Sequence, residues 1–433
     1  MKLKNLKLTN FRNFKHLEIE FNEKLNVIVA ENGIGKTTLL DAIAIGYGAM
    51  LTRFPKVSGK TFEESDLRFD ENNQASPYMR VELESYNNIV WDRTQSKNQS
   101  KAVKKMIPEA KGLKKLYEYI DGVIEEEHNH VNTPSIPLIM YYGTSRAVLK
   151  SPMRKRNFKK EFLRYEALSG SLDADTNFSR LFQWFDAMQN EENRKIKEKR
   201  DFDYTLPALE SVRNALEVML PDMQNPRILT RPLRFVIDKK VNQKNVTFRI
   251  DQLSDGYKTV LAMVMDISAR MAEANPHLDN PNESEALVMI DEVDLHLHPR
   301  WQQTILIDLQ KAFPNAQFIV TTHSPQVLTT VPSDRIQIIS HDKLYSAPAG
   351  IEGAEASRVL KRVFDVDLRP KNSVTIKLDS YLDLVYKDQW EDEEALQYRR
   401  ELDAIFNGEE PALMEADLYI ENRKWEMEIE EGY

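Results

Sequence analysis

The fold of this chain is decided by Leu25-Asn26-Val27-Ile28-Val29-Ala30-Glu31-Asn32-Gly33-Ile34-Gly35-Lys36-Thr37. The apolar run at 25–29 predicts a buried strand, and residues 38–50 predict a helix. The loop between them fits Gly-x-x-x-x-Gly-Lys-Ser/Thr except at its first position, where Ala30 stands. A methyl group is the smallest departure from glycine, so the segment predicts a phosphate-binding loop in preference to a glycine turn before an ordinary helix.

The backbone of this loop is expected to bind a nucleotide. Consecutive N–H groups at the start of a helix point toward an anion, and the helix dipole favours negative charge there. The two glycines let the backbone approach phosphate closely, the Lys36 ammonium supplies charge to the β- and γ-phosphates, and the Thr37 hydroxyl can hold Mg²⁺. We therefore expect ATP and Mg²⁺ as ligands, with nucleotide contacts from Asn32, Gly33, Gly35, Lys36, Thr37 and Thr38.

A second apolar run ends in two carboxylates. Residues 287–290 read Leu-Val-Met-Ile and are followed by Asp291 and Glu292. A buried strand that ends beside the phosphate loop would deliver Asp291 to Mg²⁺, and it would deliver Glu292 to the attacking water for orientation and deprotonation. Strands often end in acids, so the pattern gains its meaning from the phosphate loop upstream.

Two further segments follow the order of a known family. Leu253-Ser254-Asp255-Gly256-Tyr257 resembles the Leu-Ser-Gly-Gly-Gln signature of ABC-type ATPases, with Asp255 and Tyr257 as departures. The resemblance implies that Ser254 and Gly256 present donors to a γ-phosphate, and an ordinary N-cap serine is the alternative. Residues 321–325, Thr-Thr-His-Ser-Pro, imply by the same resemblance that His323 is a switch histidine that donates to that phosphate.

The chain more closely resembles the soluble ABC ATPases related to Rad50 and RecF. The resemblance is carried by residues 10–14 (Asn-Phe-Arg-Asn-Phe), 290–299 and 321–325. Among these ATPases the chain is most similar to those of bacterial anti-phage systems, such as PtuA of Septu and the ATPases of some retrons.

That resemblance implies how such a protein would work. An ATP-hydrolysing subunit would form a homodimer by sandwiching ATP between the Lys36 loop of one chain and Ser254 of the other. Arg12 would lie near the nucleotide, unless it is a surface residue between strands, and the dimer would control an HNH-type nuclease. An ATP-dependent DNA clamp of the RecF type is the alternative function. Binding of DNA or another nucleic acid, and assembly beyond the dimer, stay open.

Composition narrows the class of protein. The chain has 433 residues, a net charge of −9 and no cysteine, which excludes disulfide scaffolds, thiolate nucleophiles and cysteine-ligated zinc. The sequence contains neither an apolar run long enough to span a membrane nor a signal peptide, so we expect a cytoplasmic protein without membrane contact.

Strands that alternate with helices predict an α/β fold with a largely parallel sheet. The family resemblance implies that this fold is an ABC ATPase head, whose mixed and parallel sheet is flanked by helices. The expected parts are an ATPase lobe with the phosphate loop and a basic insertion (1–146), a helical insertion (147–230), a lobe with the signature, acidic strand and switch histidine (231–345), and an acidic helical tail (346–433).

Charge is distributed unevenly along the chain. Residues 371–433 carry 18 acidic and 7 basic side chains, a net charge of −11, together with apolar residues at helical spacing. Disordered segments are poorer in aromatic residues, so we expect helices, joined near Asn407-Gly408, that dock on a partner or on a second copy. The basic runs 97–115 and 150–164 are typical of solvated faces, and contact with a phosphate backbone is the alternative.

Three patterns imitate metal-dependent nucleases. His128-Asn129-His130 is a tripeptide, whereas the HNH motif of nucleases is dispersed along the chain. His296 and His298 could share a metal, but the resemblance makes them part of a structural loop. The acids within 352–367 imitate a Toprim site, yet the interval between them predicts a helix, whereas Toprim carboxylates need separate strands. We therefore expect no nuclease activity from this chain alone.

Overall fold

The chain forms two compact units, Met1–Phe364 and Asp365–Tyr433. The computed structural model describes residues 1–31, 33–98, 100–129, 133–146, 158–159, 161–174, 177–340 and 343–431. The first unit includes α10 (Ala356–Val363), so the division lies later in the chain than the boundary predicted at 346.

A six-stranded sheet forms the centre of the first unit, with the strand order β13-β12-β3-β11-β10-β6. Its strands are β3 (Leu25–Ala30), β6 (Leu138–Tyr142), β10 (Ala286–Ile290), β11 (Ala316–Thr321), β12 (Ile336–Ser340) and β13 (Lys343–Ser346). Five of them run parallel, and β13 pairs antiparallel with β12. Every residue of β3, β6, β10 and β11 is buried, which explains why these strands read as continuous apolar runs. The predicted mixed α/β fold is confirmed.

The parallel pairing brings the motif-bearing strand ends to one edge of this sheet. Ile290 lies opposite Tyr142 on one side and Val320 on the other. β3 lies on the far side of β11, and its last residue, Ala30, leads into the phosphate loop. Ligands of parallel α/β sheets bind at the carboxyl ends of the strands, so the topology places the predicted motifs where a ligand would bind.

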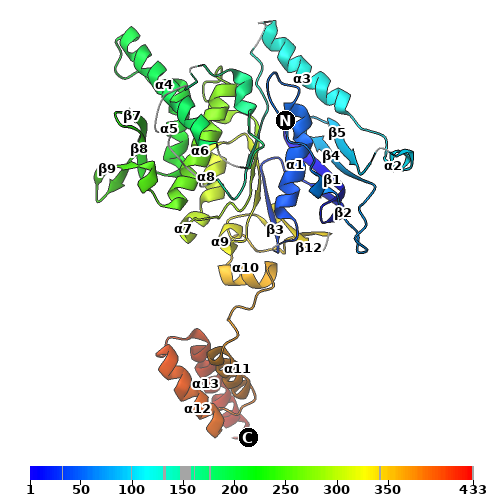
Figure 1. Ribbon diagram of the computed structural model, residues 1–433. Coiled ribbons are helices and arrows are strands. Elements are labelled where there is room, and N and C mark those ends of the chain that lie inside the picture. The colour runs from blue at the N-terminus through cyan, green and yellow to red at the C-terminus, as the bar shows by residue number, and fades with distance from the viewer. Residues whose placement is uncertain are drawn as a thin grey trace. The chain divides into compact units, whose positions relative to one another are not determined.

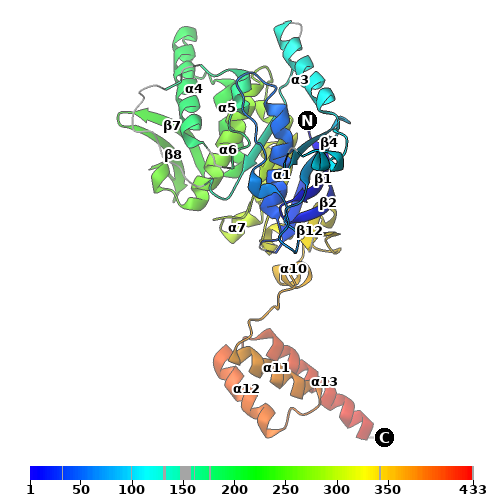
Figure 2. The same ribbon diagram turned by 45° about the vertical axis from the view of Figure 1, so that its right-hand side comes forward.

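A second, antiparallel sheet has the order β2-β1-β4-β5. Its strands are β1 (Leu3–Phe11), β2 (Phe14–Glu20), β4 (Tyr78–Ser85) and β5 (Val90–Ser96). Figure 1 shows α1 (Lys36–Leu51) between this sheet and the central strands, and every residue of α1 other than Thr37 is buried. Burial on all sides explains the predominantly apolar sequence of α1. The long helix α6 (Asp255–Ala274) lies on the opposite side of the central sheet (Figures 1 and 2).

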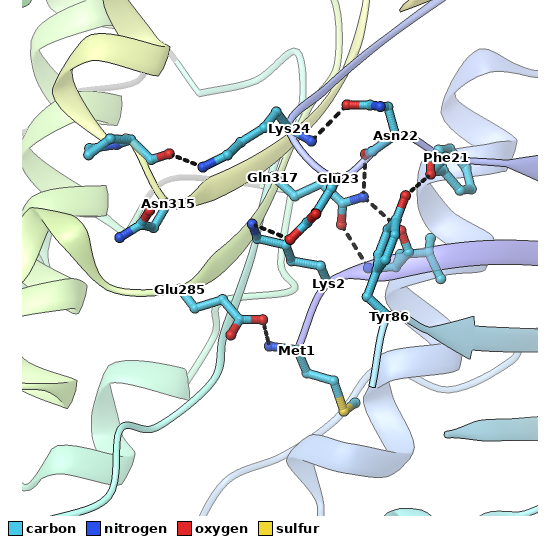
Figure 3. Close-up of polar contacts among 12 residues, drawn as sticks. Met1, Lys2, Phe21, Asn22, Glu23, Lys24, Tyr86, Glu285, Asn315 and Gln317 are labelled. Carbon is cyan, nitrogen blue, oxygen red and sulfur yellow. Dashed lines mark hydrogen bonds and ion pairs between the residues drawn. The ribbon is translucent and has the colours of Figure 1, made fainter. Parts of the chain in front are cut away.

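Polar contacts near the N-terminus join the two sheets (Figure 3). Gln317 of β11 is fully buried, and its Oε1 accepts from the Leu3 N–H at 2.7 Å. Its Nε2 donates to the carbonyls of Leu3 and Asn22, both at 2.7 Å. The Met1 ammonium pairs with Glu285 at 2.7 Å, just before β10. These contacts attach β1 to the central sheet through specific bonds as well as packing.

A lobe of helices and a three-stranded antiparallel sheet lies between β6 and α6 in the chain. Its elements are α4 (Phe178–Lys199), α5 (Pro207–Met219), β7 (Met223–Thr230), β8 (Leu233–Val241) and β9 (Lys244–Arg249). Because β7 pairs with β8, the boundary predicted between 230 and 231 falls inside this sheet. Most of the basic run 150–164 lies outside the described residues.

The other helices of the first unit are short, apart from α3. They are α2 (Lys101–Met106), α3 (Leu113–His128), α7 (Pro299–Gln302), α8 (Ile305–Ala312) and α9 (Pro325–Leu328). The helix predicted over 299–313 is divided between α7 and α8, because the backbone leaves helical geometry at Thr304, where φ is −119°.

Within residues 365–431, the second unit consists of three helices around their own apolar core. They are α11 (Ser373–Tyr386), α12 (Glu393–Phe406) and α13 (Pro411–Glu431). The core consists of Leu378, Tyr381, Val385, Trp390, Ala395, Leu402, Leu413 and Ala416. Asn407 and Gly408 turn the chain with positive φ angles of 52° and 74°, so the joint predicted there is confirmed. In the described part of the chain, no helix is long and apolar enough to cross a bilayer.

Candidate nucleotide-binding site

Two glycines shape the loop between β3 and α1. The φ angles are +81° at Gly33 and +122° at Gly35, and a Cβ at Gly35 would lie 2.7 Å from Cζ of Phe14. Both the backbone conformation and the neighbouring ring therefore require glycine at 35. The Asn13 side chain donates to the Gly33 carbonyl at 2.9 Å, so the segment at 10–14 braces the loop. Asn32, predicted to contact the nucleotide, lies outside the described residues.

Lys36 begins α1, and its ammonium lies inside the loop. Nζ donates to the carbonyl of Ala30 at 2.7 Å and to that of Glu31 at 3.3 Å. Burial lowers the pKa of Lys36, against the attraction of Asp291 and neighbouring carboxylates. The charge is therefore held next to the backbone that would surround the phosphates.

Asp291 joins the ends of three elements. Its N–H donates to the Tyr142 carbonyl of β6 at 2.8 Å. Its Oδ2 accepts from the Thr37 hydroxyl at 2.7 Å, and its Oδ1 accepts from the Thr321 hydroxyl at 2.6 Å. Asp291 is almost fully buried, and both carboxylate oxygens are engaged. The geometry brings together the two residues predicted to hold Mg²⁺.

This donor set fits Mg²⁺ in a particular way. Mg²⁺ in phosphate-transfer sites is bound by one or two protein oxygens, with phosphates and waters as the remaining ligands. The Thr37 hydroxyl and the Asp291 carboxylate supply such a pair of oxygens. Among the residues that the structure describes, no group of three or more His, Cys, Asp or Glu side chains could hold a metal. A cation here would therefore depend on phosphate oxygens for part of its shell.

Glu292 has a strained backbone that is held on both sides. Its φ is +47°, which is costly for a residue with a side chain. Its N–H donates to the Thr321 hydroxyl at 2.7 Å, and its carbonyl accepts from Arg146 at 2.6 Å. Thr321 therefore positions Asp291 and Glu292 together. The place of Thr321 in the Thr-Thr-His-Ser-Pro motif did not predict this role.

Arg146 is a buried residue whose role was likewise not predicted from the sequence. Its guanidinium donates to the carbonyls of Gly143 at 2.7 Å and of Asp291 and Glu292, both at 2.6 Å. Burial lowers the pKa of Arg146 to about 10. The side chain is 1% exposed and so acts as an internal clamp under the acidic strand end.

His323 follows β11 with an unsatisfied ring nitrogen. Its Nε2 is buried and has no hydrogen-bond partner within the described ranges. Burial, reinforced by the nearby Lys36 charge, lowers the pKa of His323, so the imidazole is neutral near pH 7. The residue before His323, Thr322, is fixed by its hydroxyl, which donates to Asp294 at 2.5 Å. A buried nitrogen without a partner is costly, and it suits a group whose partner is a ligand.

Arg12 is engaged by two carboxylates beside α1. Its Nε donates to Asp66 and its Nη1 to Asp41, both at 2.7 Å, and its side chain is 27% exposed. Asp41 belongs to α1 and also accepts from Lys60 at 2.6 Å. These pairs bring Arg12 to the helix that begins at Lys36, but they also commit its guanidinium to structural contacts.

The signature segment forms the N-terminus of α6 and packs on the loop that follows Glu292. Ser254 is the N-cap residue and is exposed, yet no capping hydrogen bond from its side chain is found in the described structure. A Cβ on Gly256 would lie 2.7 Å from the His296 carbonyl, so glycine allows this close approach. The Tyr257 and Trp301 rings meet edge to face at 4.5 Å. Because the Ser254 hydroxyl makes no capping bond among the described residues, it is available to an acceptor outside the helix.

Within the described residues, the nuclease-like patterns form no metal site of three or more His, Cys, Asp or Glu side chains. His298 accepts from the Arg300 N–H at 3.3 Å and caps α7, which fits a structural role. The interval between the acids at 352–355 and 365–367 is the helix α10, as predicted. His130 lies outside the described residues, and the same holds for the side chain of His128.

Comparison with known proteins identifies the family. A model described as "AAA domain" matches residues 5–224, and one described as "AAA domain, putative AbiEii toxin, Type IV TA system" matches residues 141–329. Over 99% of this chain and 88% of the relative, the sequence is 30% identical to Retron Ec83 probable ATPase from Escherichia coli. The chain belongs to the ABC-type ATPases of bacterial anti-phage defence.

Two further relatives agree with this assignment. The defence ATPase is 29% identical to Retron Vc95 probable ATPase from Vibrio cholerae serotype O1 biovar El Tor, over 83% of the chain and 78% of that protein. It is 25% identical to Septu protein PtuA from Bacillus mycoides (strain KBAB4), over 78% of the chain and 40% of that protein. The defence ATPase therefore binds and hydrolyses ATP, and the predicted family and enzyme class are confirmed.

Proposed function

We propose that this defence ATPase is a switch that closes as a homodimer around ATP. Each nucleotide would lie between the Lys36 loop of one chain and Ser254 of a second copy. The observation that carries the proposal is the exposed Ser254 hydroxyl, which makes no capping bond in the described structure although it stands at the start of a 20-residue helix. Because α1 and α6 lie on opposite sides of the central sheet (Figure 1), Ser254 is suited to a nucleotide that another chain holds.

Within one chain, the loop and α1 would hold the phosphates. Backbone N–H groups from the loop through Thr38 would surround the oxygens, and Lys36 would exchange its two carbonyl acceptors for phosphate oxygens. The Thr37 hydroxyl and Asp291 would hold Mg²⁺, which supplies charge for the β- and γ-phosphates.

Hydrolysis would depend on the residues that follow β10 and β11. Glu292 would orient and deprotonate the attacking water from its fixed backbone position. His323, neutral through burial, would donate its ring N–H to the γ-phosphate. Arg12 would steady the start of α1 through Asp41, and Gly256 would keep the signature close to the loop after Glu292.

The closed dimer can be tested with Glu292→Gln, which keeps the shape of the side chain and removes the base. With ATP and Mg²⁺ its mass by size exclusion with light scattering should double while bound ATP persists. Adding Ser254→Arg should abolish the doubling and leave binding of a fluorescent ATP analogue intact. The same measurement on a chain that ends at Pro370 excludes an oligomer that the tail already forms without ATP. If Glu292→Gln binds ATP in both chains without any change in mass, the proposed ATP-bridged dimer is wrong.

We further propose that closure controls a separate nuclease, of HNH type by the family resemblance, which docks on the acidic tail. Support comes from the relatives, which are named as retron and Septu proteins. Co-expression with the product of a neighbouring HNH reading frame should give a stable complex whose DNA cleavage changes with Glu292→Gln. ATP-dependent retention on DNA without any nuclease partner would instead favour a repair clamp.

A further inference from the structure

The last helix of the chain, α13, has two apolar faces. One face packs on α11 and α12, with Leu413 and Ala416 buried and Ile420 and Met427 against the core. The second face consists of Met414, Leu418, Trp425 and Ile429, which are 53, 60, 66 and 45% exposed. At about 100° per residue, these four positions fall within about 60° of one another. We call this set the outer stripe of α13.

The outer stripe is not needed by the core of its own unit. The other tryptophan of the tail, Trp390, is 8% exposed and completes that core, whereas Trp425 is the most exposed tryptophan of the chain. A row of large apolar side chains on one face of a helix matches the mode in which helices dock on one another through i, i+4 and i+7 contacts. Large exposed apolar side chains gathered on one face of a helix mark interaction surfaces.

The acidic side chains along the outer stripe indicate what kind of surface can bind there. Glu415, Glu421 and Glu426 are exposed along it. Glu426 is paired with Arg423 at 3.0 Å, and Asp417 at the edge of the stripe is paired with Arg399. A second copy of α13 would bring acids against acids, which disfavours self-association. Helices that lie on anionic membranes carry lysine and arginine on their polar face, the opposite of this arrangement. An occupant with basic side chains beside its apolar stripe complements both features.

We propose that the outer stripe of α13 is the docking site for a basic amphipathic helix of a partner protein. The inference rests on the proposed function in one respect, because it requires that the complex contain a partner other than a second copy. Apolar contact with Trp425 and Leu418 holds the partner helix, and the flanking acids select its charge and speed its encounter.

The test uses the full chain and a synthetic amphipathic helix of leucine and lysine as probe. Binding should shift the emission of Trp425 to shorter wavelength and register in calorimetry. Trp425→Ala and Leu418→Ala should each weaken binding about tenfold or more. Because Trp425→Ala removes the fluorescent reporter, its binding is measured by calorimetry. Ile376→Ala is the matched control, since Ile376 is 60% exposed on α11, and it should change nothing. A probe with glutamate in place of lysine should not bind.

Several outcomes would overturn the inference. Equal binding of the lysine and glutamate probes would remove the charge argument, and unchanged binding to Trp425→Ala would remove the site. Self-association without any probe that Trp425→Ala abolishes would assign the stripe to a second copy. Because all variants should keep the ATP-dependent doubling of mass seen with Glu292→Gln, a failure of the ATP sandwich is distinguishable from a failure of this site.

Discussion

Replacing Thr321 by valine tests whether this residue organises the hydrolytic site. The change keeps the shape of the side chain but removes the hydroxyl that donates to Asp291 at 2.6 Å and accepts from the Glu292 N–H at 2.7 Å. A hydrogen bond to a charged group contributes about 1.5–3 kcal/mol and a neutral one about 0.5–1.5 kcal/mol. The combined loss of about 2–4.5 kcal/mol falls on Asp291 and Glu292, the residues predicted to hold Mg²⁺ and to activate water.

Part of that loss affects the ground state, so kcat/KM for ATP should fall roughly tenfold to a hundredfold, at about 1.4 kcal/mol per factor of ten. Steady-state ATPase assays over a range of Mg²⁺ concentrations should also show that Mg²⁺ binds more weakly, so that half-maximal activity needs a higher Mg²⁺ concentration. Thr321→Ser keeps the hydroxyl and is the control, with activity close to that of the unaltered chain. The reasoning is refuted if Thr321→Val stays within twofold of the original activity, or if Thr321→Ser is equally impaired.

Burial holds the pKa of His323 below its usual value of 6.5, because the folded state disfavours the charged imidazole. The free energy of unfolding is therefore highest above pH 6.5, where the imidazole is neutral in both states, and it decreases as the pH falls through the lowered pKa. His323→Asn should flatten that part of the pH dependence in urea unfolding between about pH 7.5 and 5.5. Gly256→Ala would place a methyl group 2.7 Å from the His296 carbonyl, which costs about 1–3 kcal/mol. It should reduce ATP-dependent dimerisation while nucleotide binding persists, as fluorescent nucleotide and light scattering would report. A chain that ends at Pro370 should still bind ATP, because all phosphate-handling motifs precede it, but co-purification should show that it has lost its partner or its higher assembly.

Most of the fold could be predicted from the sequence because the central strands are buried on both faces. Burial makes 25–30 and 286–290 read as uninterrupted apolar runs, and each run ends at a recognisable motif. The division of the chain into parts was harder to predict. β7 is a strand in a region expected to be helical, because its pairing with β8 outweighs local preference.

The candidate site divides in a similar way. Lys36, Thr37 and Asp291 belong to short motifs whose chemistry depends on neighbouring residues, so they could be found from the sequence. Arg146 and Thr321 act through contacts between strands that are distant in the chain, and no local spacing predicts those contacts. Knowledge of the strand order alone would have pointed to them, since both lie at the same edge of the sheet as Asp291.

The glutamine at 317 has a consequence for how the molecule opens. Its amide is bonded to both backbone groups of Leu3, so β1 cannot leave β11 without exposing the buried N–H and carbonyl of Leu3 together with the Gln317 amide. Local fluctuations that separate the two sheets are therefore suppressed, and the sheets belong to one cooperative opening unit. In hydrogen exchange, amides of β1 and β11 should accordingly become labelled with similar protection, as a single block of high free energy.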